Sequence, residues 1–220
     1  MHNFNDQDTR AIVQALRGKI YLDQLTDADF NRIEAEAKDV VRQVVERNAA
    51  HGRSLETISV HAVMGLTGQH AIAHRLAEAG LDIRQFDPSI TTDVDMIVNQ
   101  KWLEVKHQNV FHNVVSFSHS QLLETMIKAT RSQRLDYFIA YKMFLTRHLE
   151  QAKYPDMRQF VLPWMMINMK TFESYLALSK DGFSTYKFYM SERARQVGEC
   201  VLLNAIPDEL QPWVFKQDQM

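Results

Sequence analysis

The segment from Thr91 to Gln108, TTDVDMIVNQKWLEVKHQ, constrains the fold of this chain more than any other. Two runs that alternate between polar and apolar residues flank Asn99-Gln100, and this pattern predicts a β-hairpin with a two-residue turn. That turn would set Asp95 opposite Glu104. Because successive side chains of a strand point to opposite faces, this register divides the hairpin into two faces. One face carries Asp93, Asp95, Glu104 and Lys106, and the other carries the apolar Val94, Met96, Val98, Leu103 and Val105.

The polar face of this hairpin holds two opposed carboxylates. Directly opposed residues have Cβ atoms about 4.5–5.5 Å apart. Two carboxylates at that separation repel each other unless a cation lies between them or one of them is protonated. The arrangement therefore predicts a divalent metal site at Asp95 and Glu104 with Lys106 beside it. The alternative is a solvated surface on which Asp93 pairs with Lys106.

Composition narrows the class of protein. The chain has 220 residues, of which 45% are hydrophobic and 24% charged, as expected for a globular protein with a substantial core. A single cysteine, Cys200, excludes an internal disulfide framework and favours a reducing, cytoplasmic location. The N-terminal residues MHNFNDQDTR do not resemble a signal peptide, and no apolar run is long enough to span a membrane. A net charge of −2 argues against a generally basic protein that coats nucleic acid.

Periodicity predicts an α/β fold in which helices flank a central sheet. Residues 1–55 read as a helical N-terminal extension in which Ile12, Leu16 and Ile20 share one stripe, and residues 56–220 read as an α/β domain. Within that domain we expect a helix over 55–79 that ends at Gly80, strands over 81–86, 92–98 and 102–107, a helix over 120–134, and strands over 137–143 and 160–167. Pro163 predicts an edge strand or a bulge at the last of these. A short helix over 170–179 and a strand over 183–190 complete the assignment.

This order of elements, with Asp95 on one strand of a hairpin and Glu104-Val105-Lys106 on the next, resembles the PD-(D/E)xK nuclease superfamily. The resemblance covers about residues 60–145. It implies a restriction-endonuclease-like core of helix, three strands, helix and strand. The helix before the hairpin often carries a Gly-Glu pair in this family, and the corresponding pair here is Gly68-Gln69. Gln121 is the nearest match to a polar residue of the following helix.

The resemblance also implies an activity. Asp95 and Glu104 would bind Mg²⁺, for which Mn²⁺ can substitute, and Lys106 would assist the attacking water. Gln69 would take the place of a third acidic residue, although an amide oxygen binds a hard cation more weakly than a carboxylate does. The expected function is Mg²⁺-dependent hydrolysis of phosphodiester bonds by a DNA endonuclease of restriction, repair or mobile-element type. The alternative is a catalytically weak or inactive nucleic-acid-binding protein on the same fold.

Other charged residues suggest partners and a rival site. Lys128, Arg131 and Arg134 recur along one predicted helix and could contact a DNA or RNA backbone, although a solvated helix face explains them equally well. His70 and His74 have the i, i+4 spacing of some zinc pairs, but lack a nearby third ligand and are more simply structural histidines. DNA is the favoured partner and RNA a second option. The N-terminal helices offer a surface for a homodimer by analogy with restriction enzymes.

Overall fold

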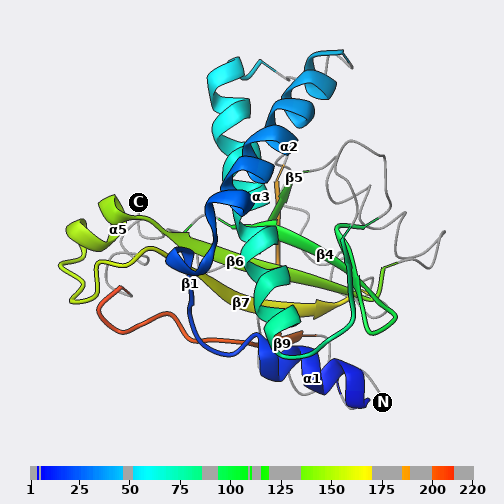
Figure 1. The fold of residues 1–220 in the computed structure, drawn as a ribbon. Coiled ribbons are helices and arrows are strands. Elements are labelled where there is room, and N and C mark those ends of the chain that lie inside the picture. The colour runs from blue at the N-terminus through cyan, green and yellow to red at the C-terminus, as the bar shows by residue number, and fades with distance from the viewer. Residues whose placement is uncertain are drawn as a thin grey trace.

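The central feature of the fold is a mixed sheet covered on one face by helices (Figure 1). The structure is a computed structural model, and it describes residues 4, 6–46, 52–85, 94–108, 110, 115–118, 135–169, 185–188 and 200–210. Helix and strand together confirm the predicted α/β class. The predicted helices over 120–134 and 170–179 lie outside the described residues. None of the described helices is long and apolar enough to cross a membrane.

The sheet has the strand order β1-β7-β6-β4-β3-β2, and β9 pairs with β7 as well. Neighbouring strands are antiparallel except β4 and β6, which run parallel over five residue pairs. A separate pair of strands, β5 and β8, is also present. The strands are β1 (Ile20–Tyr21), β2 (Ile83–Gln85), β3 (Met96–Val98), β4 (Lys101–His107), β5 (Val115–Ser118), β6 (Tyr137–Phe144), β7 (Phe160–Asn168), β8 (Thr185–Phe188) and β9 (Cys200–Leu202).

The hairpin of β3 and β4 has the predicted register. Met96 pairs with Leu103, Ile97 with Trp102, and Val98 with Lys101. Asn99 and Gln100 have positive φ values of 45° and 66°, the conformation that a two-residue turn of the favoured hairpin type requires. This turn is tied to the neighbouring chain because the backbone N–H of Asn99 donates to the carbonyl of Asp82 at 2.9 Å.

Helix α3 (Leu55–Glu78) has the predicted limits. Ser54 caps its N-terminus by accepting a hydrogen bond from the backbone of Thr57, and Gly80, with φ +78°, closes its C-terminus. Figure 1 shows α3 lying across one face of the sheet, with α2 (Asp27–Glu46) alongside it. Helix α1 (Gln7–Ala15) also contributes to the core between the helices and the sheet, whereas α5 (Thr146–Gln151) contributes Leu149 to the core of the opposite face.

Two features depart from or refine the expected elements. Ile20 does not continue the first helix: α1 ends before Gly18, whose φ is +86°, and Ile20 pairs with Val161 as part of β1. The segment 1–55 therefore supplies a strand to the sheet as well as helices. Pro163 lies in an inner strand, and the bulge predicted as its alternative is present, because Ala140 pairs with Met165 and Tyr141 pairs with Pro163.

The contact of α3 with the sheet depends on Gly68. A Cβ atom at this position would overlap with the ring and hydroxyl of Tyr141, a fully buried side chain of β6. That ring cannot easily move away, since its hydroxyl donates to the carbonyl of Gly65 at 3.0 Å. Gly65, one turn earlier in the helix, has open space where its Cβ would be. The two glycines therefore have different structural roles.

We expect Gly68→Ala to lower the free energy of unfolding by about 1–3 kcal/mol through overpacking. Gly65→Ala is the matched control and should raise it by about 0.5–1 kcal/mol, because alanine favours a helix. Urea unfolding followed by circular dichroism measures both. Equal effects of the two substitutions would contradict the close packing of α3 on Tyr141.

Candidate functional site

Asp95 lies directly before β3, where the regular backbone hydrogen bonds between β3 and β4 stop. Strand β3 begins at Met96, and the backbone N–H of Asp95 donates to the carbonyl of Leu103 at 3.1 Å. The backbone N–H of Val105 then donates to Oδ2 of Asp95 at 2.7 Å, so a side-chain oxygen replaces a backbone acceptor. Asp95 is therefore held against β4 just outside the strand pairing.

Lys106 joins the two predicted carboxylates. Its Nζ lies 2.7 Å from Oε1 of Glu104 and 3.3 Å from Oδ2 of Asp95. The three side chains, called the Asp-Glu-Lys triad below, differ in exposure: 4% for Glu104, 18% for Asp95 and 36% for Lys106. Lys106 was predicted to stand beside the two acids, and the structure places its ammonium in contact with both. The repulsion expected between the carboxylates is thus offset by a cation from the chain itself.

The charge state of Lys106 follows from these contacts. Burial of the ammonium by itself would lower its pKa, but the charges of Asp95 and Glu104 and their hydrogen bonds overcome this and raise the pKa of Lys106 well above its ordinary value. Lys106 therefore remains a cation at neutral pH. Its charge is available either to balance the two acids or to meet an anionic group.

The triad lies on the sheet face opposite α3. Glu104 and Lys106 pair laterally with Phe138 and Ala140 of β6, and Phe138 and Ala140 belong to the core away from that helix. Trp102, on the same side of β4, packs against this core.

Two buried polar residues extend this face. Alternation along β4 and β6 continues from Lys106 to Gln108 and from Ala140 to Lys142, which are 6% and 0% exposed. The Nζ of Lys142 lies 4.4 Å from the ring centroid of Trp164, a favourable cation–π distance. Neither residue was predicted as a site residue from the sequence. Lys142 is the single charged residue of the β6 sequence YFIAYKMF. A lone charge in a predicted buried strand is the sequence feature that could have identified it.

The other predicted site residues are not joined to the triad. Gln69 lies on α3, half-buried, and no hydrogen bond connects it to Asp95, Glu104 or Lys106 within the described part of the chain. The predicted nucleic-acid contacts, Lys128, Arg131 and Arg134, lie outside the described residues. Asp93 of the hairpin and Gln121 of the following predicted helix also lie outside them.

The two histidines considered as a zinc pair, His70 and His74, contact different acids. Nε2 of His70 lies 2.9 Å from Oε2 of Glu36 on α2, and Oε1 of the same carboxylate accepts from Arg32 at 2.7 Å. Nδ1 of His74 faces Glu78 at 3.7 Å. Both histidines line a cavity of about 290 Å³ between α2 and α3, which Arg32 also lines. Asp29 lines the same cavity, and Arg32 is paired with Glu36. Through its contact with Glu36, His70 joins α3 to α2.

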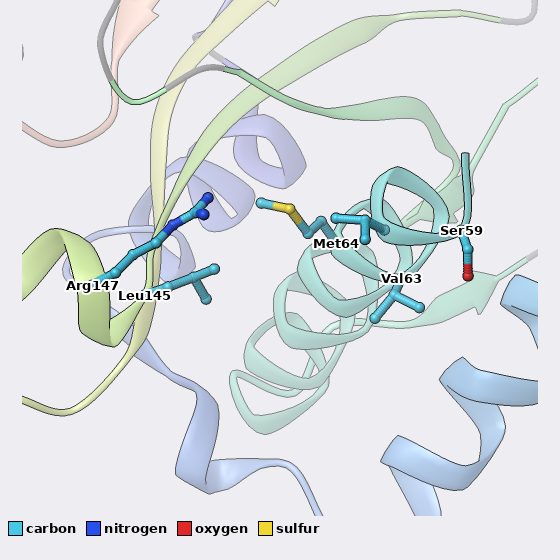
Figure 2. A pocket seen from close by; sticks show the side chains of 6 residues that line it. Ser59, Val63, Met64, Leu145 and Arg147 are labelled. Atoms are coloured by element: carbon cyan, nitrogen blue, oxygen red, sulfur yellow. The ribbon is translucent and has the colours of Figure 1, made fainter. Parts of the chain in front are cut away.

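A second cavity, of about 380 Å³, lies between α3 and the start of α5 (Figure 2). It is lined mainly by apolar side chains, and Arg147 is its one charged lining residue among those described. No residue of the triad lines this cavity. It therefore does not contribute to the candidate site. The lining residues are Ser59, Val60, Val63, Met64, Leu145 and Arg147.

The donor set of the triad fits a hard divalent cation. Mg²⁺ prefers oxygen ligands and is commonly held by one or two carboxylates together with water and substrate phosphates. Asp95 and Glu104 supply two such ligands. Within the described residues no group of three or more His, Cys, Asp or Glu side chains is arranged to hold a metal ion. Among the described residues, a metal at Asp95 and Glu104 would therefore find no third carboxylate, histidine or cysteine ligand.

Comparisons of the chain with protein-family models, with curated proteins and with solved structures found no match.

His107, which follows the triad in β4, lies in an environment that disfavours its charged form. Burial is the main cause, and the charge of Lys142 adds to it, so the pKa of His107 falls from 6.5 to about 4. Its Nε2 is buried without a hydrogen-bond partner among the described residues, and its ring lies 5.5 Å from that of Tyr141. Folding therefore favours neutral His107.

We expect the protein to lose stability as the pH falls from about 6.5 to about 4, because the unfolded chain then binds a proton that folded His107 does not. His107→Phe keeps an aromatic ring and should flatten this part of the profile. Urea unfolding at a series of pH values measures the slope. An unaltered slope in His107→Phe would assign the acid sensitivity to other groups.

Proposed function

We propose that this protein is a Mg²⁺-dependent nuclease that hydrolyses phosphodiester bonds of DNA. The observation that carries the proposal is the Asp-Glu-Lys triad itself. Glu104 is a buried acid of the central strand β4, and Asp95 is held against that strand by the Val105 N–H. Lys106 follows Glu104 by two residues and contacts both acids. This combination of two hard oxygen ligands and an adjacent cation suits the hydrolysis of a phosphate ester.

The connectivity of the sheet supports the same proposal. Helix α3 is followed by the antiparallel strands β2, β3 and β4. After β5, which belongs to the separate pair of strands, the next strand of the main sheet is β6, which runs parallel to β4. A parallel connection requires a crossover of a dozen or more residues, and the chain between His107 and Tyr137 is long enough for the helix predicted there. This order is the one that the restriction-endonuclease-like core implies. We therefore propose that core for about residues 60–145.

The chemistry divides among three side chains. A divalent metal bound by Asp95 and Glu104 would polarise the phosphate and lower the pKa of a bound water. Lys106, which remains charged at neutral pH, would donate hydrogen bonds to the negative charge that develops on the phosphate oxygens. The bond from the Val105 N–H to Asp95 keeps that carboxylate in place, and the burial of Glu104 restricts its motion.

The proposal is tested by incubating the protein with supercoiled plasmid and with single-stranded DNA in the presence of Mg²⁺, Mn²⁺ or EDTA. We expect nicking or cutting with either metal and none with EDTA. Asp95→Asn should reduce the rate to background, and Lys106→Ala should reduce it roughly 100-fold or more, the usual effect of removing one group that stabilises transition-state charge.

Two matched controls separate chemistry from folding. Lys101→Ala removes another lysine of β4 whose ion pair is with Asp6, and Asp82→Asn removes an exposed acid before β2. Both variants should retain activity. DNA retention without cutting under every metal would favour the alternative of an inactive DNA-binding protein, and an active Asp95→Asn variant would exclude the triad as the site. Cleavage of RNA in preference to DNA would reassign the substrate.

A further inference from the structure

The contacts of Lys106 have a consequence for metal binding that rests on the proposed function. The oxygens that its ammonium contacts, Oε1 of Glu104 and Oδ2 of Asp95, belong to the two carboxylates proposed as metal ligands. Without a metal, the triad is already partly neutralised, with two negative charges and one positive. The site is therefore less attractive to a divalent cation than two unpaired carboxylates would be.

A metal ion and this ammonium cannot both make their best contacts. Mg²⁺ binds oxygen at about 2.0–2.1 Å. If the ion took the oxygens that Lys106 contacts at 2.7 and 3.3 Å, the metal and the ammonium would share these oxygens and repel each other. If it took the second oxygen of each carboxylate, two cations would lie within a few ångströms of each other and repel. Either arrangement makes metal binding oppose the ion pairs of Lys106.

We infer that Lys106 is a resident counter-cation that competes with the divalent metal for Asp95 and Glu104. Metal binding then includes the movement of the ammonium away from the two acids. An anionic phosphodiester offers the displaced ammonium a new partner. Phosphodiester and metal should therefore each raise the affinity of the site for the other, since coupling between two ligands is reciprocal.

The burial of Glu104 links Lys106 to the stability of the metal-free protein as well as to metal affinity. Glu104 is 4% exposed, and removing one partner of a buried ion pair is strongly destabilising. Replacing Lys106 by a neutral side chain of similar length should destabilise the metal-free protein. A bound divalent ion should then restore the missing charge and with it the stability.

The test compares Mn²⁺ binding and thermal stability of the wild-type protein and Lys106→Met, in the absence of DNA. Mn²⁺ binding is measured by electron paramagnetic resonance of the free ion. We expect Lys106→Met to bind Mn²⁺ about tenfold more tightly or better, because one nearby positive charge is removed from a partly exposed site. Its Tm should fall without metal, and Mn²⁺ should raise that Tm by more than it raises the wild-type Tm.

Three further variants test whether the gain of Mn²⁺ affinity comes from removing the charge of Lys106. Lys101→Met, on the same strand, should leave Mn²⁺ affinity unchanged. Lys106→Arg keeps the charge and should show no gain. Adding Glu104→Gln to Lys106→Met should abolish the gain, because the metal then loses a ligand. If Lys106→Met does not fold, Lys106→Gln, whose amide can donate to a carboxylate, provides the same comparison.

The coupling to phosphate is measured with dimethyl phosphate, a minimal phosphodiester that is hydrolysed very slowly. Its presence should tighten Mn²⁺ binding to the wild-type protein by a larger factor than it does for Lys106→Met. Equal factors would overturn the coupling, and equal or weaker Mn²⁺ binding by folded Lys106→Met would overturn the competition itself.

These outcomes are distinguishable from failure of the nuclease proposal. Metal-dependent DNA cleavage together with no gain of Mn²⁺ affinity in Lys106→Met would retain the nuclease and exclude the competition. The gain of affinity without any DNA cleavage would retain the competing lysine and exclude the nuclease.

Discussion

The burial of Glu104 is the constraint on which the candidate site depends. Strand β4 is a central strand, paired with β3 on one side and β6 on the other, so a carboxylate in its middle is removed from solvent. A buried carboxylate needs a cation and hydrogen bonds, and Lys106 supplies the cation from the same face two residues later. The position of Asp95 follows, because its carboxylate accepts from Val105 and thereby reaches the same ammonium.

The same sheet serves two distinct roles on its two faces. On one face, apolar residues of β3, β4 and β6 pack under α3, and Gly68 allows that helix to approach Tyr141 closely. On the other face, polar and charged side chains are embedded in a core of aromatic and aliphatic residues. Rigid packing behind a polar site limits the movement of its side chains, which favours preorganised electrostatics over flexible surface charge.

Charge balance connects the proposed activity to the proposed competition. A site built for a divalent ion carries a negative charge that costs stability whenever the ion is absent. Lys106 would reduce that loss of stability and would also lower the affinity for the metal. When an anionic substrate enters, the same ammonium could bind its phosphate. Stability of the empty site and cooperation between metal and phosphate would then arise from one side chain.

The sequence by itself determined the local features of this protein. The turn at Asn99-Gln100, the register of the hairpin, and the limits of α3 depend on neighbouring residues, since alternation, capping and positive φ are properties of short segments. Only the tertiary structure decided which side chains meet. It joined Lys106 to both acids, buried Lys142 against Trp164, and placed Ile20 in a strand beside β7. These outcomes depend on contacts between segments far apart in the chain, which sequence periodicity does not encode.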